Sequence, residues 1–186
     1  MPNRRSMEIP GRGGGRVSPL GTEGELGPVP PGGRDGVGPI RGLGLPWELP
    51  HTFLGLDEEA SDLSASKALI ISVPYESTTS WGGGTQAGPG AILSASRYIE
   101  LWDQELRTDT ATVGIHTLPA LELTRAGAEA AMEELEEAYG KILGACGDRF
   151  PVMLGGEHSI SAPAIRAVAA RLDSRPTVLQ FDAHAD

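Results

Sequence analysis

The sequence predicts an α/β protein, a three-layer arrangement of a parallel sheet with helices on both faces, and two observations support this. Short apolar runs alternate with longer stretches whose apolar residues recur at helical spacing, which is the order that βαβ units produce. The short runs are apolar at successive positions, as in strands covered on both faces. The 186 residues are enough for one ordinary domain.

The first regular elements are expected between residues 67 and 116. Residues 67–75, KALIISVPY, form a short run rich in isoleucine and valine that ends at proline, so we expect a buried strand. A helix is expected over 88–106, beginning near Pro89. Residues 110–116, TATVGIH, predict a second strand. The expected buried face of the helix consists of Ile92, Ala95, Ser96, Ile99 and Trp102.

Four more elements are expected after Thr124, which we predict to cap a long helix. Strands are predicted at 150–156 and 176–182, and between them a helix at 161–172 with Pro163 in its first turn. The buried face of the long helix is predicted from residues at helical spacing: Ala128, Ala131, Met132, Leu135, Ala138, Tyr139, Ile142 and Cys146. Cys146 is the single cysteine, so we expect it to pack in the core, and no intrachain disulfide is possible.

The N-terminal part differs in composition from the rest. Glycine and proline fill 22 of the first 50 positions, and such a segment buries too little apolar surface to offset the entropy of ordering it. We therefore predict a disordered tail over residues 1–50, a linker over 51–65 and one domain over 66–186.

Charge and hydropathy narrow the class of protein. The formal charge of −10 disfavours nucleic acid or an anionic membrane as partner, because no basic surplus neutralises phosphates, and it permits a cationic substrate. No apolar run approaches the roughly 20 residues that span a bilayer. The N-terminus has no secretory pattern, so a cytoplasmic protein is expected.

Two polar motifs stand where predicted strands end, which is where parallel α/β sheets bind ligands. They are GGEHS, residues 155–159, and DAHAD, residues 182–186. In an extended DAHAD, alternate residues share a face, so Asp182, His184 and Asp186 point into one space. A divalent ion would remove the cost of grouping two carboxylates. Adding His158 gives four oxygen and nitrogen ligands, which suit manganese, iron or zinc.

The remaining polar residues near these motifs have simpler interpretations. A lone histidine is more often structural than a ligand, but the joint pattern of a glycine-presented His158 and an Asp-x-His-x-Asp strand end favours a metal site. Glu157 either supports the ligands or is solvated. His51 and His116 are expected to be surface or structural residues.

The two motifs resemble those of the ureohydrolases, the family of arginase and agmatinase. Its signatures are a Gly-Gly-acid-His-Ser turn, matched by Gly155 to Ser159, and an Asp-Ala-His-x-Asp strand end, matched by Asp182 to Asp186. Upstream, VPYESTTSWGGGTQAGPGAILSAS is similar to the family's first strand and active-site loop. YIELWDQEL and VGIHTLPALE are closer to agmatinases than to arginases. The resemblance covers residues 66 to 186.

This resemblance implies an eight-stranded parallel sheet that holds two manganese ions bridged by hydroxide. It makes His158 and Asp186 ligands of one ion, His184 a ligand of the other, and Asp182 a bridging ligand. The hydroxide would attack the guanidinium carbon of a small cationic substrate, most simply agmatine, and release urea and putrescine, a step of polyamine biosynthesis. Family members commonly assemble, so a homo-oligomer is expected.

The sequence also departs from the family's pattern. The second Asp-x-Asp motif, the later acid that grips the guanidinium and the proton-shuttling histidine have no counterpart, so acid, base and substrate-binding residues are not identified. We expect this to be the N-terminal part of the domain, which alone binds metal weakly and turns over little. Gly82, Gln86 and Gly90 stand where the family often has arginines.

Several alternatives stay open. Arginase, guanidinobutyrase or formimidoylglutamase activity would use the same metal motifs. A zinc-dependent deacylase with one ion is disfavoured by the glycine-presented His158. From another class, the chain would be a catalytically silent metal-binding or oligomer-forming subunit.

Overall fold

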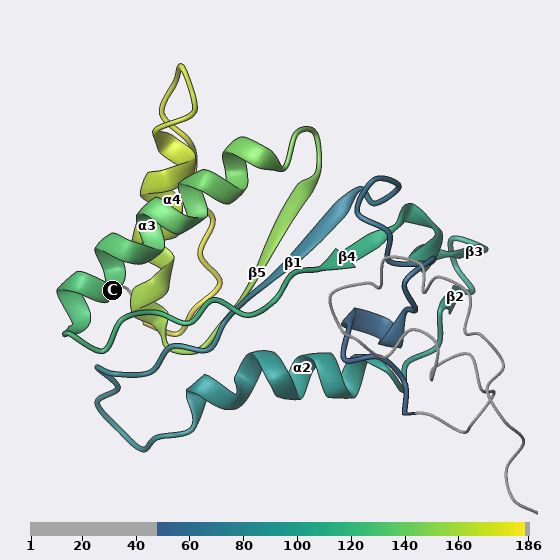
Figure 1. The fold of residues 1–186 in the computed structure, drawn as a ribbon, viewed down its shortest axis with the longest axis horizontal. Coiled ribbons are helices and arrows are strands. Elements are labelled where there is room, and N and C mark those ends of the chain that lie inside the picture. The colour runs from purple at the N-terminus through teal and green to yellow at the C-terminus, as the bar shows by residue number, and fades with distance from the viewer. Residues whose placement is uncertain (1–47, 185–186) are drawn as a thin grey trace, which may run out of the picture. The chain divides into compact units, whose positions relative to one another are not determined.

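The centre of the fold is a three-stranded parallel sheet, drawn in Figure 1. The computed structural model describes residues 48–184. The strand order is β4-β1-β5, with β1 at Ala68–Val73, β4 at Ile115–Thr117 and β5 at Phe150–Gly155. All six residues of β1 pair with β5, from Ala68 with Phe150 to Val73 with Gly155, and its first three pair with β4. The predicted α/β class with a parallel sheet is therefore confirmed.

Helices cover the sheet on two sides. Helix α2 (Gly88–Ser96) lies on one side, and α3 (Ala128–Ala145) with α4 (Ser161–Ala169) lies on the other (Figure 1). The described chain also contains short 3₁₀ turns: η1 (Phe53–Gly55), η2 (Thr85–Ala87), η3 (Thr110–Val113) and η4 (His158–Ile160). None of the described helices has the length and apolarity needed to cross a bilayer.

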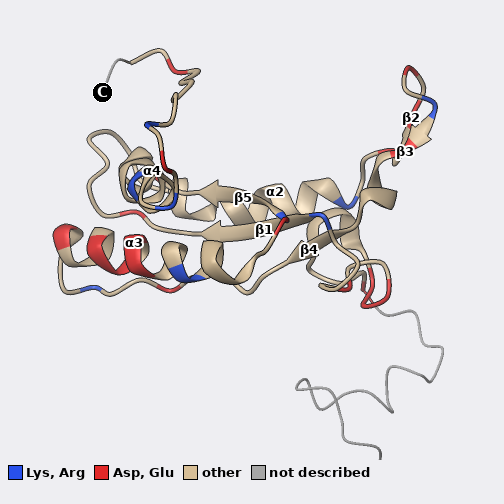
Figure 2. Cartoon of the chain, turned by 90° about the horizontal axis from the view of Figure 1, so that it is seen from above, with Lys and Arg blue, Asp and Glu red and all other residues tan. Residues whose placement is uncertain are grey.

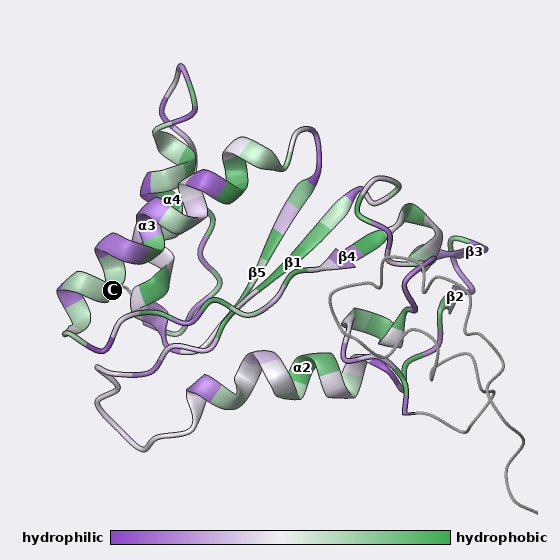
Figure 3. Cartoon of the chain, in the orientation of Figure 1, coloured by the Kyte–Doolittle hydropathy of each residue, from purple (hydrophilic) through white to green (hydrophobic). Residues whose placement is uncertain are grey.

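The main core lies between the sheet and α3 with α4. Alternate residues of β1, Ile71 and Val73, are fully buried there. They pack with Leu135 from α3 and with two small residues of α4, Ala164 and Ala167. Figure 3 shows β1 and β5 coloured largely as hydrophobic. The acidic residues that Figure 2 shows along α3 are exposed or half-buried.

The helix predicted over 88–106 is shorter and buries another face. It ends at Ser96, and the chain then forms a hairpin of β2 (Trp102–Asp103) and β3 (Thr108–Asp109). The Asp103 carboxylate accepts the N–H groups of Glu105 and Leu106, and this turn competes with the helix. The buried residues of α2 are Pro89, Leu93 and Ser96, so the expected face of Ile92, Ala95, Ile99 and Trp102 was wrong. Because the three successive residues from Ala91 to Leu93 are all apolar, the sequence does not show which face of the helix is buried.

Two other boundaries differ from the prediction. In residues 110–116 the strand begins only at Ile115, because Asp109 accepts the N–H of Ala111 and starts a 3₁₀ turn instead. The long helix begins at Ala128 with Gly127 as its cap, and the Thr124 hydroxyl accepts the N–H of Ala126 ahead of it. Its predicted face is confirmed at Ala131, Leu135 and Tyr139, and Cys146 is buried. The last helix ends at Ala169, earlier than expected.

The strand predicted at 176–182 is absent. These residues pair with no strand in the described part of the chain. Val178 is 53% exposed, Leu179 78% and Phe181 96%. Without burial of these side chains, nothing offsets the entropy of fixing the segment as a strand.

The structure describes only part of the N-terminal region. Nearly all of the tail predicted at 1–50 lies outside the described residues. In the stretch 51–65, predicted as a linker, the N–H of Phe53 donates to Thr117 of β4 and that of Leu54 to Ser96 of α2.

Candidate metal centre

The turn after β5 is built on a close approach between two backbones. Gly156 donates to the Val73 carbonyl at 3.1 Å, and the next residue, Glu157, donates to the Tyr75 carbonyl at 3.0 Å. A Cβ atom at Gly156 would lie 2.1 Å from the Tyr75 oxygen. At Gly155 it would lie 2.5 Å from Ile160 Cδ1. Neither glycine has a positive φ, so the close backbone contact, and not an unusual backbone angle, requires glycine at position 156.

Glu157 is buried and binds a neighbouring loop. The whole residue is 6% exposed. Oε2 accepts the backbone N–H groups of Ser77 at 2.7 Å and Thr78 at 2.8 Å. Oε1 accepts the hydroxyls of Thr78 at 2.6 Å and Ser159 at 2.5 Å. We call these four hydrogen bonds the Glu157 clamp. Of the two interpretations from sequence, the structure therefore excludes a solvated Glu157.

The clamp favours the ionised form of Glu157. Burial by itself would raise the pKa of this carboxyl, but the hydrogen bonds from Ser159, Thr78 and Ser77 outweigh it and lower the pKa to about 2. The group is therefore a carboxylate at neutral pH, and all its partners act as donors.

Of the four predicted metal ligands, Asp182 lies beside two others, His158 and His184. Asp182 Oδ1 is 3.1 Å from His184 Nδ1, and Asp182 Oδ2 is 3.7 Å from His158 Nδ1. The two oxygens of one carboxylate thus face two different imidazoles. The fourth predicted ligand, Asp186, lies outside the described residues.

The way in which Asp182 and His184 meet differs from the prediction. The segment is not extended as expected: the chain bends at Ala183 and His184. The backbone N–H of His184 donates to Asp182 Oδ1 at 2.9 Å, so a local turn and not strand alternation joins the two side chains. That N–H, together with the His184 and His158 imidazoles, holds the pKa of Asp182 below its usual value.

The donor atoms fit a divalent transition metal. Imidazole nitrogen and carboxylate oxygen are the ligands that such ions prefer. Two ligands of one ion, each about 2.1 Å from it, stand roughly 3 to 3.5 Å apart. The 3.1 Å between Asp182 and His184 lies within this range, and the 3.7 Å between Asp182 and His158 lies just beyond it. Each pair supplies only two donors, and among residues 48–184 no three His, Cys, Asp or Glu side chains form a complete site.

The other two histidines have structural surroundings. His116 Nδ1 is 2.6 Å from the Ser61 carbonyl, and His51 is exposed beside the start of η1. Neither contacts the three predicted ligands in the described structure.

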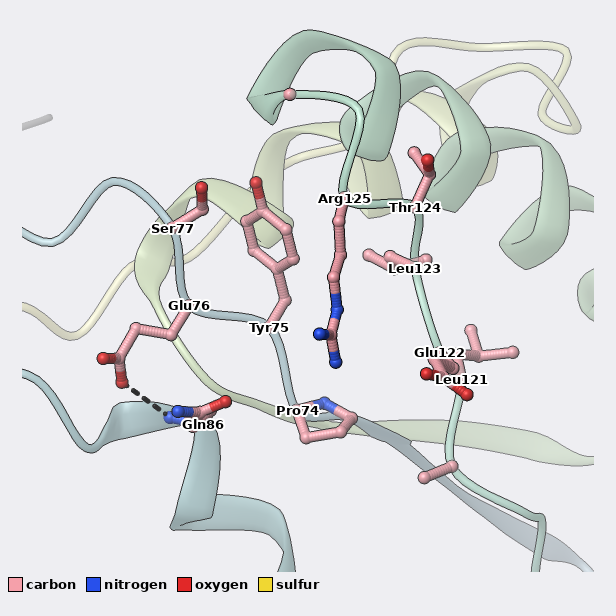
Figure 4. Close-up of a pocket in the computed structure, with 12 residues that line it drawn as sticks. Pro74, Tyr75, Glu76, Ser77, Gln86, Leu121, Glu122, Leu123, Thr124 and Arg125 are labelled. Atoms are coloured by element: carbon pink, nitrogen blue, oxygen red, sulfur yellow. Dashed lines mark hydrogen bonds between the residues drawn. The ribbon is translucent and has the colours of Figure 1, made fainter.

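A cavity of about 680 Å³ lies beyond the carboxyl ends of β1 and β4. Figure 4 shows Arg125 reaching between Tyr75 on one side and Leu123 on the other. Glu76, at its rim, accepts the N–H groups of Gly84 and Gln86 and so orders the glycine-rich loop. Ser77 lines the cavity and also donates to Glu157, so the cavity wall and the His158 turn are directly connected.

Comparison with known proteins gives a consistent family assignment. Residues 66–186 match the arginase family. An N(1)-aminopropylagmatine ureohydrolase of Synechocystis sp. is 36% identical over 135 residues, which are 70% of this chain and 44% of that protein. An agmatinase of Bacillus cereus is 31% identical over 121 residues, 65% of this chain and 41% of that protein.

A solved structure supports the fold. The agmatine ureohydrolase of Thermoplasma volcanium superposes with a TM-score of 0.54 at 22% identity, over 69% of this chain and 41% of that chain. The chain thus spans less than half the length of the proteins it matches.

Proposed function

This chain belongs to the arginase family, and from that premise we propose that the whole protein hydrolyses a small cationic guanidino compound to urea and an amine. The observation that carries the proposal is the placement of Asp182, whose two carboxylate oxygens face the Nδ1 atoms of His158 and His184. We further propose agmatine as substrate and manganese as the metal. Relatives named agmatinase and N(1)-aminopropylagmatine ureohydrolase support this class of substrate.

The chain's own residues would act by holding the metal. His158 and His184 would each bind one ion through an imidazole nitrogen, and Asp182 would bridge the ions. Asp186, from the same motif, would complete the first ion's set. Bound divalent ions lower the pKa of water, so that hydroxide is available near neutral pH.

The test is urea release by the full-length protein with Mn²⁺. We expect urea from agmatine or N(1)-aminopropylagmatine at a higher kcat/KM than from arginine or 4-guanidinobutyrate. The variant D182N should lower the rate at least about 100-fold, because it removes the negative charge that both proposed ions would share. Ser96→Ala, on the far side of the sheet, is the control and should keep the rate.

Other outcomes would select other members of the class. Preference for arginine, 4-guanidinobutyrate or formimidoylglutamate would replace agmatine but keep the family chemistry. No urea from any of these with Mn²⁺, Fe²⁺ or Zn²⁺ would favour the silent-subunit hypothesis. We also propose that the protein forms a homo-oligomer, which light scattering after size-exclusion chromatography would test.

A further inference from the structure

We propose that Glu157 is a positioning residue: its carboxylate orients the His158 turn for metal binding and fixes that turn to the loop at Ser77 and Thr78. The inference rests on the proposed function, because it takes His158 to be a metal ligand. It concerns a residue that binds neither metal nor substrate, and it follows from the four hydrogen bonds of the Glu157 clamp.

The first step is that Glu157 has no capacity left for a metal. An ionised carboxylate has about four lone-pair sites. Two backbone N–H groups and two hydroxyls donate to it at 2.5 to 2.8 Å. With all four sites in use inside a buried residue, Glu157 is excluded as a ligand although it precedes His158 in the chain.

The second step is that the clamp fixes both neighbours of His158. On one side, the Glu157 carboxylate accepts the backbone N–H groups of Ser77 and Thr78. On the other, the Ser159 hydroxyl is bound to Glu157 Oε1. The His158 side chain itself is 48% exposed and is 3.7 Å from Asp182. Its direction is therefore set mainly by the backbone on which it stands, and the clamp holds that backbone.

The third step is that the clamp connects two parts of the site. Ser77 lines the cavity beside β1 and donates to Glu157. Loss of the carboxylate would release the cavity wall and the metal-ligand turn together. A residue that only stabilised the fold would not couple these two properties.

Glutamine and alanine distinguish positioning from general stability. In E157Q, the amide oxygen can accept the two backbone N–H groups while the amide nitrogen donates to the hydroxyls of Thr78 and Ser159, which can turn to accept. In E157A, both N–H groups lose their partner. Ser96→Ala is a matched control, because it removes a buried hydroxyl that accepts the Leu54 N–H and donates to the Leu93 carbonyl, on the opposite side of the sheet.

The experiment measures Mn²⁺ affinity of the full-length protein by electron paramagnetic resonance titration, at a temperature where each variant is folded. We expect E157A to lower the affinity about 10- to 100-fold, E157Q to stay within about threefold, and S96A to match the wild type. Hydrogen exchange should show faster exchange at Ser77 and Thr78 in E157A alone.

The outcomes separate this inference from the proposed function. Wild-type affinity in E157A, or equal losses in E157A and S96A, would overturn the positioning role. Tight Mn²⁺ binding without urea release would overturn the proposed hydrolysis but leave the affinity order as a valid test. If H158A does not weaken Mn²⁺ binding, both the positioning role and the proposed function are overturned. If E157A does not fold, S159A, which removes one donor, should lower the affinity about 3- to 10-fold, and an unchanged affinity there would refute the role.

Discussion

Replacement of Gly156 by alanine should be the most damaging single-methyl change in the described chain. The new Cβ would lie 2.1 Å from the Tyr75 carbonyl oxygen and 3.0 Å from the Tyr75 nitrogen. Both contacts are with backbone, so relief requires the turn and β1 to separate by more than about 1 Å, since ordinary contact begins near 3.4 Å.

The structure gives the size of the effect. Separation would break the hydrogen bonds from Gly156 to Val73 and from Glu157 to Tyr75, each with a net contribution of about 1 kcal/mol and more if the donors stay buried. Weakening of the adjoining Glu157 clamp adds to this. We expect the free energy of unfolding to fall by about 3 to 5 kcal/mol.

The assay is urea denaturation of the full-length protein followed by circular dichroism. Gly90→Ala is the matched control, because the same methyl group there meets no atom within 4 Å and lies inside helix α2; it should be neutral or stabilise by up to about 1 kcal/mol. A loss below about 1 kcal/mol in G156A would refute the argument that close backbone approach fixes this glycine.

Three further predictions concern the clamp, the core and Cys146. The hydrogen bonds to Glu157 outweigh its burial and give a folded-state pKa of about 2, below the usual 4.5, so its contribution to stability is present above pH 4.5 and is lost as the pH falls toward 2. The wild type should lose at most about 3 kcal/mol over this range, and an equal slope in E157Q would contradict this. Leu135→Ala removes a side chain that is 0% exposed and should cost about 2 to 5 kcal/mol in the same denaturation assay, whereas Leu106→Ala, at a residue 70% exposed, should cost under about 0.5 kcal/mol. Cys146, 7% exposed, should react with a thiol reagent far more slowly in the native protein than in urea, and equal rates would show that it is not packed.

The elements that the sequence predicted well are those whose apolar pattern agrees with their burial. Strand β1 and helix α3 were found because Ile71, Val73 and Leu135 are both apolar and enclosed. The prediction failed where local polar side chains decide the backbone, as Asp103 and Asp109 do after α2 and before β4. It failed again at 176–182, because an apolar run predicts a strand only if something pairs with it.

The candidate site could likewise be predicted from the sequence only in part. Asp182 lies beside both His158 and His184, but the turn that joins Asp182 to His184 was not foreseen. The role of Glu157 could not be derived from its motif alone, since three of its four donor groups belong to residues 77 and 78. The serine and threonine at those positions were the available signal, but only the fold shows that they face Glu157.

The clamp has a consequence for the order in which the protein assembles. Ser77 and Glu157 are 80 positions apart in the chain, and contacts of such large sequence separation form late because a long loop must close first. The hydrogen bonds within helix α3 are local, so this 18-residue helix can begin to form beforehand. During synthesis, the His158 turn must therefore wait until β5 has emerged and docked on β1. If the proposed function is right, metal loading would therefore follow the assembly of the central sheet.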